Sequence, residues 1–175
     1  MERGLAVGDD AAPRADPARL SFGDTHGMQL RRVVASDLDD LLPLVREYCR
    51  FNGVDHSDED LLAVSRALIA DSGSEGVQII ARDAHDRPIG FATVVWTWAT
   101  WAGGRVGIMG DLFVAAPARR AGCARALIAA CRDECGRVGA RGLMWTTAKD
   151  NMAARALYES LGTRTREWVD YWLDT

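Results

Sequence analysis

The sequence predicts an α/β (α+β) domain in which helices cover both faces of a mixed, mostly antiparallel, twisted sheet. Two observations predict this class. The 175 residues are enough for one compact domain with its own core. Along the chain, segments rich in β-branched and aromatic residues alternate with segments whose apolar residues follow helical spacing. In chain order these segments predict the arrangement β-α-α-β-β-β-α-β-α-β.

The N-terminal part predicts a tail, a strand and two helices. Residues 1–27 are rich in Gly, Ala, Asp, Arg and Pro without periodicity, which indicates a flexible tail before a domain at 28–175. We expect a strand at 28–34. Ser36, with an acid three residues on, predicts a capped helix whose first turns Pro43 should disturb. A second capping pattern at Ser57 predicts the next helix.

The centre of the chain predicts three strands, a helix and a fourth strand. Segments 77–82 and 89–98 flank a turn-rich stretch and predict a hairpin. The strand expected at 105–114 contains two glycines, which indicate a bulge or a close backbone approach. A helix at 122–138 and a strand at 141–147 then complete a strand-turn-helix-strand unit.

A last helix and a last strand are expected near the C-terminus. The helix at 151–161 ends at Gly162, a residue type favoured just past helix ends. The strand at 165–173 is aromatic, and we expect its Trp168, Tyr171 and Trp172 either to pair two copies of the chain or to face the core.

Composition excludes several classes of protein. No run of 18 apolar residues occurs, and the N-terminus lacks the apolar segment of a secretory signal, so we expect a soluble, cytoplasmic protein with no membrane partner. The four cysteines form no C-x-x-C pair and the three histidines are scattered, so we expect no metal. Cys131 and Cys135 are four residues apart on a predicted helix and should be buried thiols.

The charge is divided along the chain. Twelve acidic residues stand against four arginines from Ser36 to Asp86, whereas seven arginines stand against three acids from Arg105 to Arg141. A short arginine cluster in an acidic protein suits a small polyanion better than nucleic acid, which we do not expect as a partner. The alternative is that these charges are solvated surface residues.

A glycine turn lies between the end of a predicted strand and the start of a predicted helix. It reads Arg119-Arg120-Ala121-Gly122-Cys123-Ala124. The first N–H groups of a helix can bind a pyrophosphate, and Gly122 allows that group to come close. No G-K-[ST] follows the glycine and no G-x-G-x-x-G is present, which excludes P-loop and Rossmann sites.

This turn resembles the R/Q-x-x-G-x-G/A motif of the GNAT acetyltransferase superfamily. Further along, 151–162 is similar to the family's N-x-x-A-x-x-L-Y-x-x-L-G helix. Two departures are Ala124 in place of the usual last glycine and Ala121 where many members carry Lys or Arg. The resemblance implies one GNAT domain, acetyl-CoA as cosubstrate, a homodimer, and N-acetylation of a primary amine by direct attack on the thioester.

The resemblance also implies site residues. The strand around Asp111 should splay from its neighbour, and the amides of Leu112 and Val114 should face the pantetheine and the thioester carbonyl. The turn should bind the pyrophosphate. The implied cofactor-binding residues are Leu112, Phe113, Val114, Arg119, Arg120, Gly122, Cys123, Ala124 and Asn151.

Two residues are candidates for catalysis. Tyr158 is the expected general acid for the coenzyme A sulfur, since a phenol with a pKa of about 10 is protonated at neutral pH; the alternative is a core tyrosine. Asn151 either binds cofactor or caps its helix. Asp111 is the nearest acidic candidate for the base or is structural, because Gly110 stands where polyamine-acetylating relatives carry a glutamate.

The acceptor is expected to be small and cationic, polyamine-like or amino-acid-like. Residues 97–105 and 110–114 resemble the spermidine/spermine and thialysine acetyltransferase branch. Trp96, Trp98 and Trp101 could hold an ammonium by cation–π contact; the alternative is that Trp96 and Trp98 lie on one face of a strand and simply pack. An aminoglycoside-type enzyme, a protein N-terminal or lysine acetyltransferase, and a non-catalytic acyl-CoA-binding sensor remain alternatives.

Overall fold

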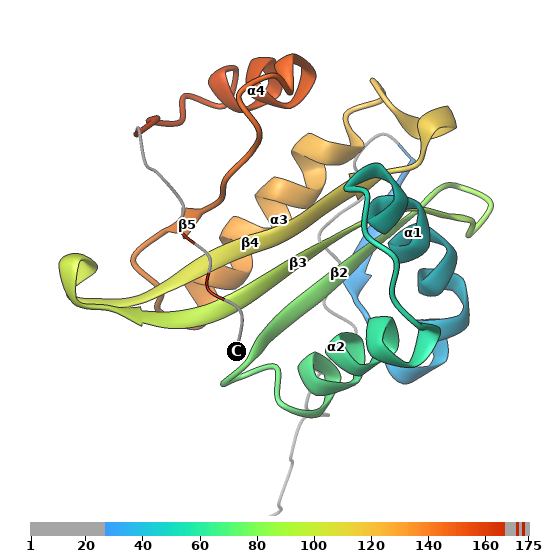
Figure 1. Ribbon diagram of the computed structural model, residues 1–175, viewed down its shortest axis with the longest axis horizontal. Helices are drawn as coiled ribbons and strands as arrows, with labels where there is room; N and C mark the ends of the chain where they lie inside the picture. Colours follow the sequence, from blue (N-terminus) through green and yellow to red (C-terminus); the bar gives the residue numbers. More distant parts are fainter. Residues whose placement is uncertain (1–26, 167–170, 172, 174–175) are drawn as a thin grey trace, which may run out of the picture.

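A five-stranded twisted sheet lies between helices in the computed structural model, which describes residues 27–166, 171 and 173 (Figure 1). The predicted tail lies outside these residues except for Gly27. The helices and strands are β1 Gln29–Arg32, α1 Leu38–Phe51, α2 Asp58–Ala70, β2 Gly76–Arg82, β3 Pro88–Ala99, β4 Gly104–Val114, α3 Cys123–Arg137, β5 Leu143–Met144 and α4 Met152–Glu159.

The strand order is the chain order. Each of β1 to β4 pairs antiparallel with the next, and β5 pairs parallel with β4. A parallel neighbour requires a crossover, which α3 supplies. The predicted α/β class with a mixed, mostly antiparallel sheet is confirmed.

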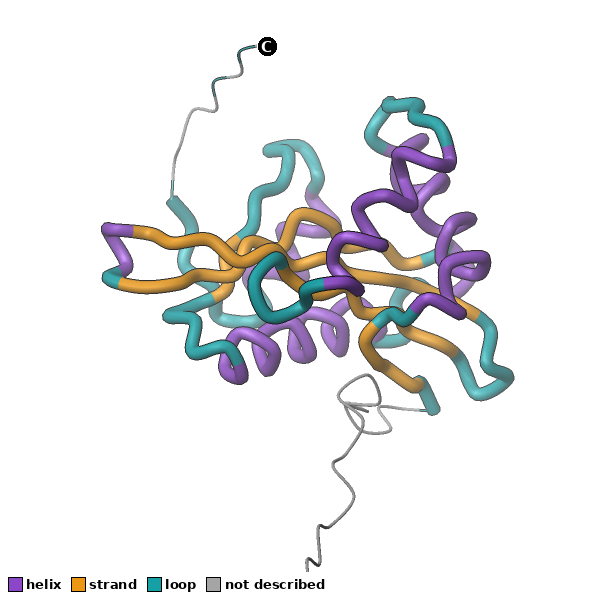
Figure 2. Tube along the Cα trace, turned by 90° about the horizontal axis from the view of Figure 1, so that it is seen from below, coloured by secondary structure: helices purple, strands orange, loops and turns teal. Residues whose placement is uncertain are grey.

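Helices cover both faces of the sheet, as the view in Figure 2 shows. On the α3 face, alternate strand residues such as Val77, Ile79 and Val94 pack against buried residues of α3 such as Leu127. On the α1 face, the opposite strand residues pack against α1, partly buried Leu61 and Ile69 of α2 joining them. The cysteine prediction is confirmed, because Cys49, Cys123, Cys131 and Cys135 are all buried and unpaired.

Two adjacent arginines of β1 hold the two helical layers to the sheet. Successive strand residues point to opposite faces. Arg31 therefore reaches Asp37 just before α1, at 2.6 Å between Nη2 and Oδ1, and Arg32 reaches Glu134 of α3, at 2.8 Å between Nε and Oε1. On β2, Arg82 also donates to Asp37, at 2.9 Å. Asp37 and Glu134 are both buried.

The start of α1 differs from the prediction. Ser36 does not cap the helix, because it lies in a 3-10 turn, Ala35–Asp37, and the residue before the helix is Asp37. Helix α1 continues through Pro43, and the irregular turn precedes it. The second cap is confirmed, since Ser57 Oγ accepts a hydrogen bond from the Asp60 amide N–H at 3.2 Å.

The C-terminal third departs most from the prediction. The strand expected at 141–147 is only Leu143–Met144, because β5 loses its pairing with β4 after Met144. Of the strand expected at 165–173, Thr165, Arg166, Tyr171 and Leu173 are not in a strand, and the other residues lie outside those described. Within the described part of the chain, no helix is long and apolar enough to cross a membrane.

Candidate active site

A bulge divides β4 into two halves. Thr93 of β3 pairs with Asp111, but Val94 pairs with Met109, so Gly110 is an extra residue on β4. The hydroxyl of Tyr48, on α1, donates to the carbonyl of Gly110 at 3.2 Å. The bulge predicted from the glycines is therefore at Gly110. Gly107 shows the close backbone approach that was the other prediction, because a Cβ there would lie 2.6 Å from the sulfur of Cys135 on α3.

The bulge changes which backbone groups face the outer side of β4. The outer side is the edge toward β5, and the inner side is the edge toward β3. Before it, Gly107 N–H donates outward to Gly142 O at 2.9 Å. After it, Ala115 N–H donates inward to Ile89 O, also at 2.9 Å. Because successive residues alternate between neighbouring strands, Leu112 and Val114 face outward. Since β5 ends at Met144, no described strand pairs with the outer side of β4 at these two residues, although β3 pairs with its inner side.

The glycine turn follows this unpaired edge. Gly122 precedes α3 with φ +85°, a conformation that favours glycine, and Arg120 has φ +64°. No side chain of the described residues caps α3, whose first internal bond runs from Ala126 N–H to Gly122 O at 3.0 Å. The amides of Cys123 and Ala124 precede that bond, so they are available to an anion.

The individual turn residues differ in what they offer a ligand. Arg119 lies in the turn, but its Nε donates to Val114 O at 3.0 Å, so this side chain fastens the turn to β4. Cys123 offers only its backbone, because its side chain is buried and burial raises the pKa of its thiol to about 11. Phe113 is buried on the α1 face of the sheet, away from the outer edge.

Tyr158 lies on α4, on the α3 face of the sheet. Its ring packs edge-on against Trp145, with 5.2 Å between centroids, and half-burial raises its pKa. Leu112, Val114 and Tyr158 all pack on the same core cluster. Asn151 Oδ1 accepts a hydrogen bond from the Ala154 amide N–H at 3.2 Å, so Asn151 caps α4. Contact between Asn151 and a cofactor stays a prediction.

Asp111 lies on the other face of the sheet. It is half-buried and pairs across the strands with Thr93, next to α1. Burial raises the pKa of the Tyr48 hydroxyl, and the negative charge of Asp111 raises it further. The two catalytic candidates, Asp111 and Tyr158, therefore approach β4 from opposite faces.

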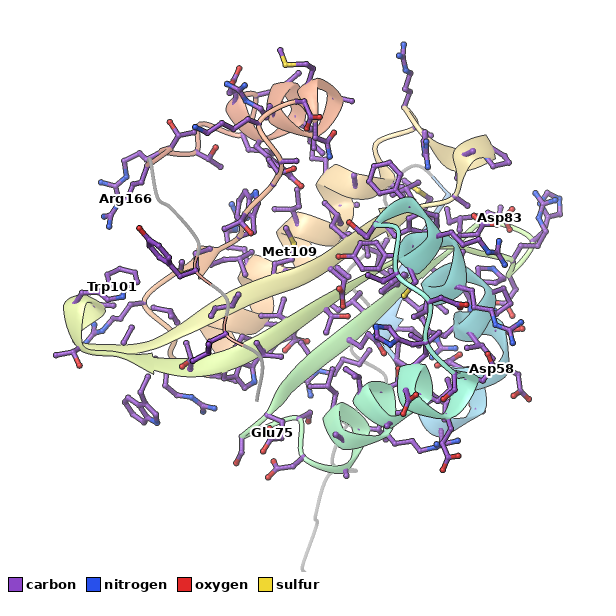
Figure 3. All side chains as sticks on the ribbon, in the orientation of Figure 1. Asp58, Glu75, Asp83, Trp101, Met109 and Arg166 are labelled. Atoms are coloured by element: carbon purple, nitrogen blue, oxygen red, sulfur yellow. The ribbon has the colours of Figure 1, made fainter. Side chains whose placement is uncertain are left out.

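The tryptophans do not gather around Asp111. Trp96 is buried on the α3 face, where its Nε1 donates to Ser72 O at 3.0 Å. Trp98 is 78% exposed, so the expected packing is confirmed for Trp96 and wrong for Trp98. Trp101 lies at the tip of the β3–β4 hairpin (Figure 3), with the guanidinium of Arg166 5.7 Å from its ring centroid. The structure thus gives no support to a tryptophan site for the acceptor ammonium.

Several site residues were not predicted from the sequence. Tyr48, Thr93 and Gln78 lie on the α1 face near Asp111, and Trp145 lies against Tyr158. Tyr48 follows Val45 by three residues, so helical spacing could have placed it on the buried side of α1. Nothing in the sequence distinguished the other three. Among the described residues, no group of three His, Cys, Asp or Glu side chains is arranged to hold a metal ion.

Comparison with known proteins agrees with this architecture. Residues 39–163 match the model of the acetyltransferase (GNAT) family. The chain is 30% identical over 135 residues to the uncharacterized N-acetyltransferase YhfO of Bacillus subtilis, covering 77% of this chain and 89% of YhfO. A crystal structure of a probable acetyltransferase is 26% identical, with a TM-score of 0.72 and coverage of 83% of this chain and 97% of that one.

A further similar fold is that of AAC(6')-Iy in complex with a bisubstrate analogue, CoA-S-monomethyl-acetylneamine. The two sequences are 22% identical and the structures give a TM-score of 0.74. The matched region covers 85% of this chain and 98% of that chain. At this identity the likeness concerns the fold. Together with the family match over most of the sequence, these findings show that the chain belongs to the GNAT acetyltransferase family.

Proposed function

We propose that this protein is an acetyl-CoA-dependent N-acetyltransferase that acts on a small primary amine. One observation carries the proposal. The outward backbone of Leu112 and Val114, which no described strand pairs, leads along the chain to the uncapped start of α3 at Gly122. A ligand with an amide-bearing arm and a pyrophosphate matches both features.

The residues of this edge fit acetyl-CoA. Leu112 and Val114 would hold the pantetheine arm through backbone hydrogen bonds, and the amides of Cys123 and Ala124 would hold the pyrophosphate. Arg120, exposed beside them, would add a cationic donor, while Arg119 holds the turn against Val114 O. Acetyl-CoA supplies a thioester, whose carbonyl carbon accepts the amine.

Asp111 and Tyr158 divide the proton transfers between the two faces of β4. A primary ammonium with a pKa near 10.4 is only about 0.04% neutral at pH 7, so an acceptor for its proton is needed, and Asp111 is the candidate. As the C–N bond forms and the C–S bond breaks, Tyr158 donates its proton to the leaving sulfur, and the second proton lost by the nitrogen restores the tyrosine hydroxyl. The raised pKa of Tyr158 keeps its hydroxyl protonated until that step.

The resemblance to the spermidine/spermine and thialysine branch implies a small cationic acceptor, amino-acid-like or polyamine-like. The acidic residues of 36–86 favour a cation. Aminoglycoside acetylation is a second candidate, because AAC(6')-Iy shares the fold. A homodimer and a cytoplasmic location remain predictions from the sequence.

The test is acceptor-stimulated release of free thiol from acetyl-CoA, followed by mass spectrometry of the acetylated product. We expect Tyr158→Phe to lower kcat by roughly a hundredfold, the usual size of a general-acid contribution. Acetyl-CoA binding should be retained, because the ring can still pack against Trp145. An unchanged kcat would remove Tyr158 from the mechanism. Cofactor binding without turnover of any amine class would leave only a sensor.

A further inference from the structure

We propose, on the basis of the N-acetyltransferase activity proposed above, that the acceptor is a single primary amine carried on an apolar stem. Its ammonium would lie between Asp111 and Tyr48, and its stem would lie over Val95 and Ile108. Three neighbouring rows of side chains on the α1 face of the sheet support this assignment.

The first row is apolar and closed. Ile80, Phe91 and Phe113 are cross-strand neighbours on β2, β3 and β4. They are 0%, 1% and 7% exposed under α1, where the ring of Tyr48 packs edge-on against both phenylalanines at 5.9 and 6.4 Å. No ligand can enter this row.

The second row is polar and lies where the bulge begins. Gln78, Thr93 and Asp111 occupy consecutive strands in register, and Gln78 Nε2 donates to Thr93 Oγ1 at 3.0 Å. Gln78 and Thr93 are almost fully buried, whereas Asp111 is half-buried. Polar side chains are costly inside an apolar face unless they meet polar partners. This row therefore marks the place where a polar group of the acceptor would be bound.

The third row is apolar and accessible. Val95 pairs with Ile108 one step beyond the polar row, on the same face as Asp111. Val95 is 38% exposed, Ile108 is half-buried, and neither belongs to a core cluster. In Figure 1, helices α1 and α2 lie in front of the right-hand part of the sheet, and no helix lies in front of the left-hand part of β3 and β4.

The charge at the bulge suits one ammonium. The buried carboxylates of Asp37 and Glu134 each pair with arginines. Asp111, by contrast, forms no ion pair with any arginine or lysine of the described residues. A cationic acceptor would supply that charge, and the Tyr48 hydroxyl, bound to the Gly110 carbonyl, would hold the bulge in place beside it.

This pattern separates the candidate acceptors. A polyamine would place a second charge over Val95 and Ile108, and an aminoglycoside would place hydroxyl groups there. Either would lose hydration without gaining a partner on these two side chains. An alkyl or aryl stem would instead bury apolar surface against them, with a gain of about 0.8 kcal/mol per CH2 group.

The experiment compares kcat/KM for propylamine, butylamine, pentylamine and hexylamine with that for spermidine and neamine. We expect kcat/KM to rise about fourfold for each added CH2, since that is the factor equivalent to its burial. Val95→Thr, which keeps the side-chain shape, should lower the value for hexylamine by about fourfold and leave propylamine nearly unchanged. Val64→Thr, at an exposed position on α2, is the matched control and should change neither.

Tyr48→Phe tests the ammonium end of the site. The ring can still pack against Phe91 and Phe113, so stability should hold, while loss of the hydroxyl should raise KM for every amine and leave KM for acetyl-CoA unchanged. A flat alkyl series, or a preference for spermidine or neamine, overturns this inference and leaves the proposed function standing. Absence of thiol release with all amines overturns both.

Discussion

The two ends of the sheet are built in opposite ways. At the β1 end, Arg31 and Arg32 fasten the strand to the helical layers on both faces through buried carboxylates. At the β4 end, β5 supplies only two paired residues and α4 has no buried residue. The comparison teaches that buried ion pairs fasten the β1 end, whereas β4 keeps an outer side that no described strand pairs, at the place where a cosubstrate would bind.

The largest effect is expected at the fastened end. Asp37→Asn would leave Arg82, which is almost fully buried, without its buried carboxylate partner. Removing one member of a buried ion pair costs about 3–5 kcal/mol. Urea unfolding measures the loss. The matched control is Asp58→Asn, which breaks the exposed pair with Arg46 and should cost less than about 1 kcal/mol. Equal losses would show that β1 is not the stabilised end.

The same carboxylate predicts the pH dependence of stability. Burial raises the pKa of Asp37, but hydrogen bonds from Arg31, the Val34 amide and Arg82 outweigh burial and hold it below the usual value. A lowered folded-state pKa stabilises the protein above the unfolded-state pKa, near 3.9, and this stabilisation is lost as pH falls towards the folded-state value. The free energy of unfolding should therefore drop below about pH 4 in the wild type and drop less in Asp37→Asn.

A smaller effect is expected in the middle of β4, where the sheet changes from one arrangement to the other. A Cβ on Gly107 would lie 2.6 Å from Cys135 Sγ and 3.0 Å from Val94, because α3 packs closely against the paired half of the strand. Overpacking of this kind costs about 1–3 kcal/mol, so Gly107→Ala should lower the free energy of unfolding by that amount.

Gly110→Ala is the matched variant three residues along. Nothing lies within 4 Å of a Cβ there, and its φ is not in the left-handed region. Its free energy of unfolding should stay within about 0.5 kcal/mol of the wild type, as for surface substitutions. Should both glycines prove equally sensitive in thermal and urea unfolding, the two halves of β4 would not differ in packing.

The sequence predicted the fold well where local patterns decide it. Segments rich in β-branched and aromatic residues located β2 and β3, and the Ser57 cap located α2, because residue preferences and capping act over a few residues. Prediction was poorer for Ser36 and for 141–147. Arginines from β1 and β2 bind Asp37 at the start of α1, and β5 stops pairing with β4 just before the bulge at Gly110. Both are long-range effects.

The site divides in the same way. The proposed cofactor turn was visible because its residues are contiguous, and the left-handed φ of Gly122 agrees with the need for glycine there. Of the proposed acceptor side, only Asp111 was named from the sequence. Tyr48, Gln78, Thr93 and Asp111 come from four elements and are brought together only through strand register and the packing of α1. A lone tyrosine in an amphipathic helix carries no local sign of that role.

At the unpaired end, Gly122→Ala should lower stability modestly and mainly affect the cosubstrate. At φ +85° an added Cβ costs about 1–2 kcal/mol, although nothing lies within 4 Å of it. Gly139→Ala is the matched control, because Gly139 has φ +69° just beyond the other end of α3 and is equally free of contacts. Both variants should lose similar stability in urea.

Only Gly122→Ala should raise KM for acetyl-CoA, by roughly tenfold, the equivalent of one hydrogen bond to a charged group. The reason is positional: relaxing the left-handed turn would move the amides of Cys123 and Ala124, whereas relaxing Gly139 moves none of the amides that start α3. If Gly139→Ala raised KM as much, the effect would come from loss of stability, and the start of α3 would not be the pyrophosphate site.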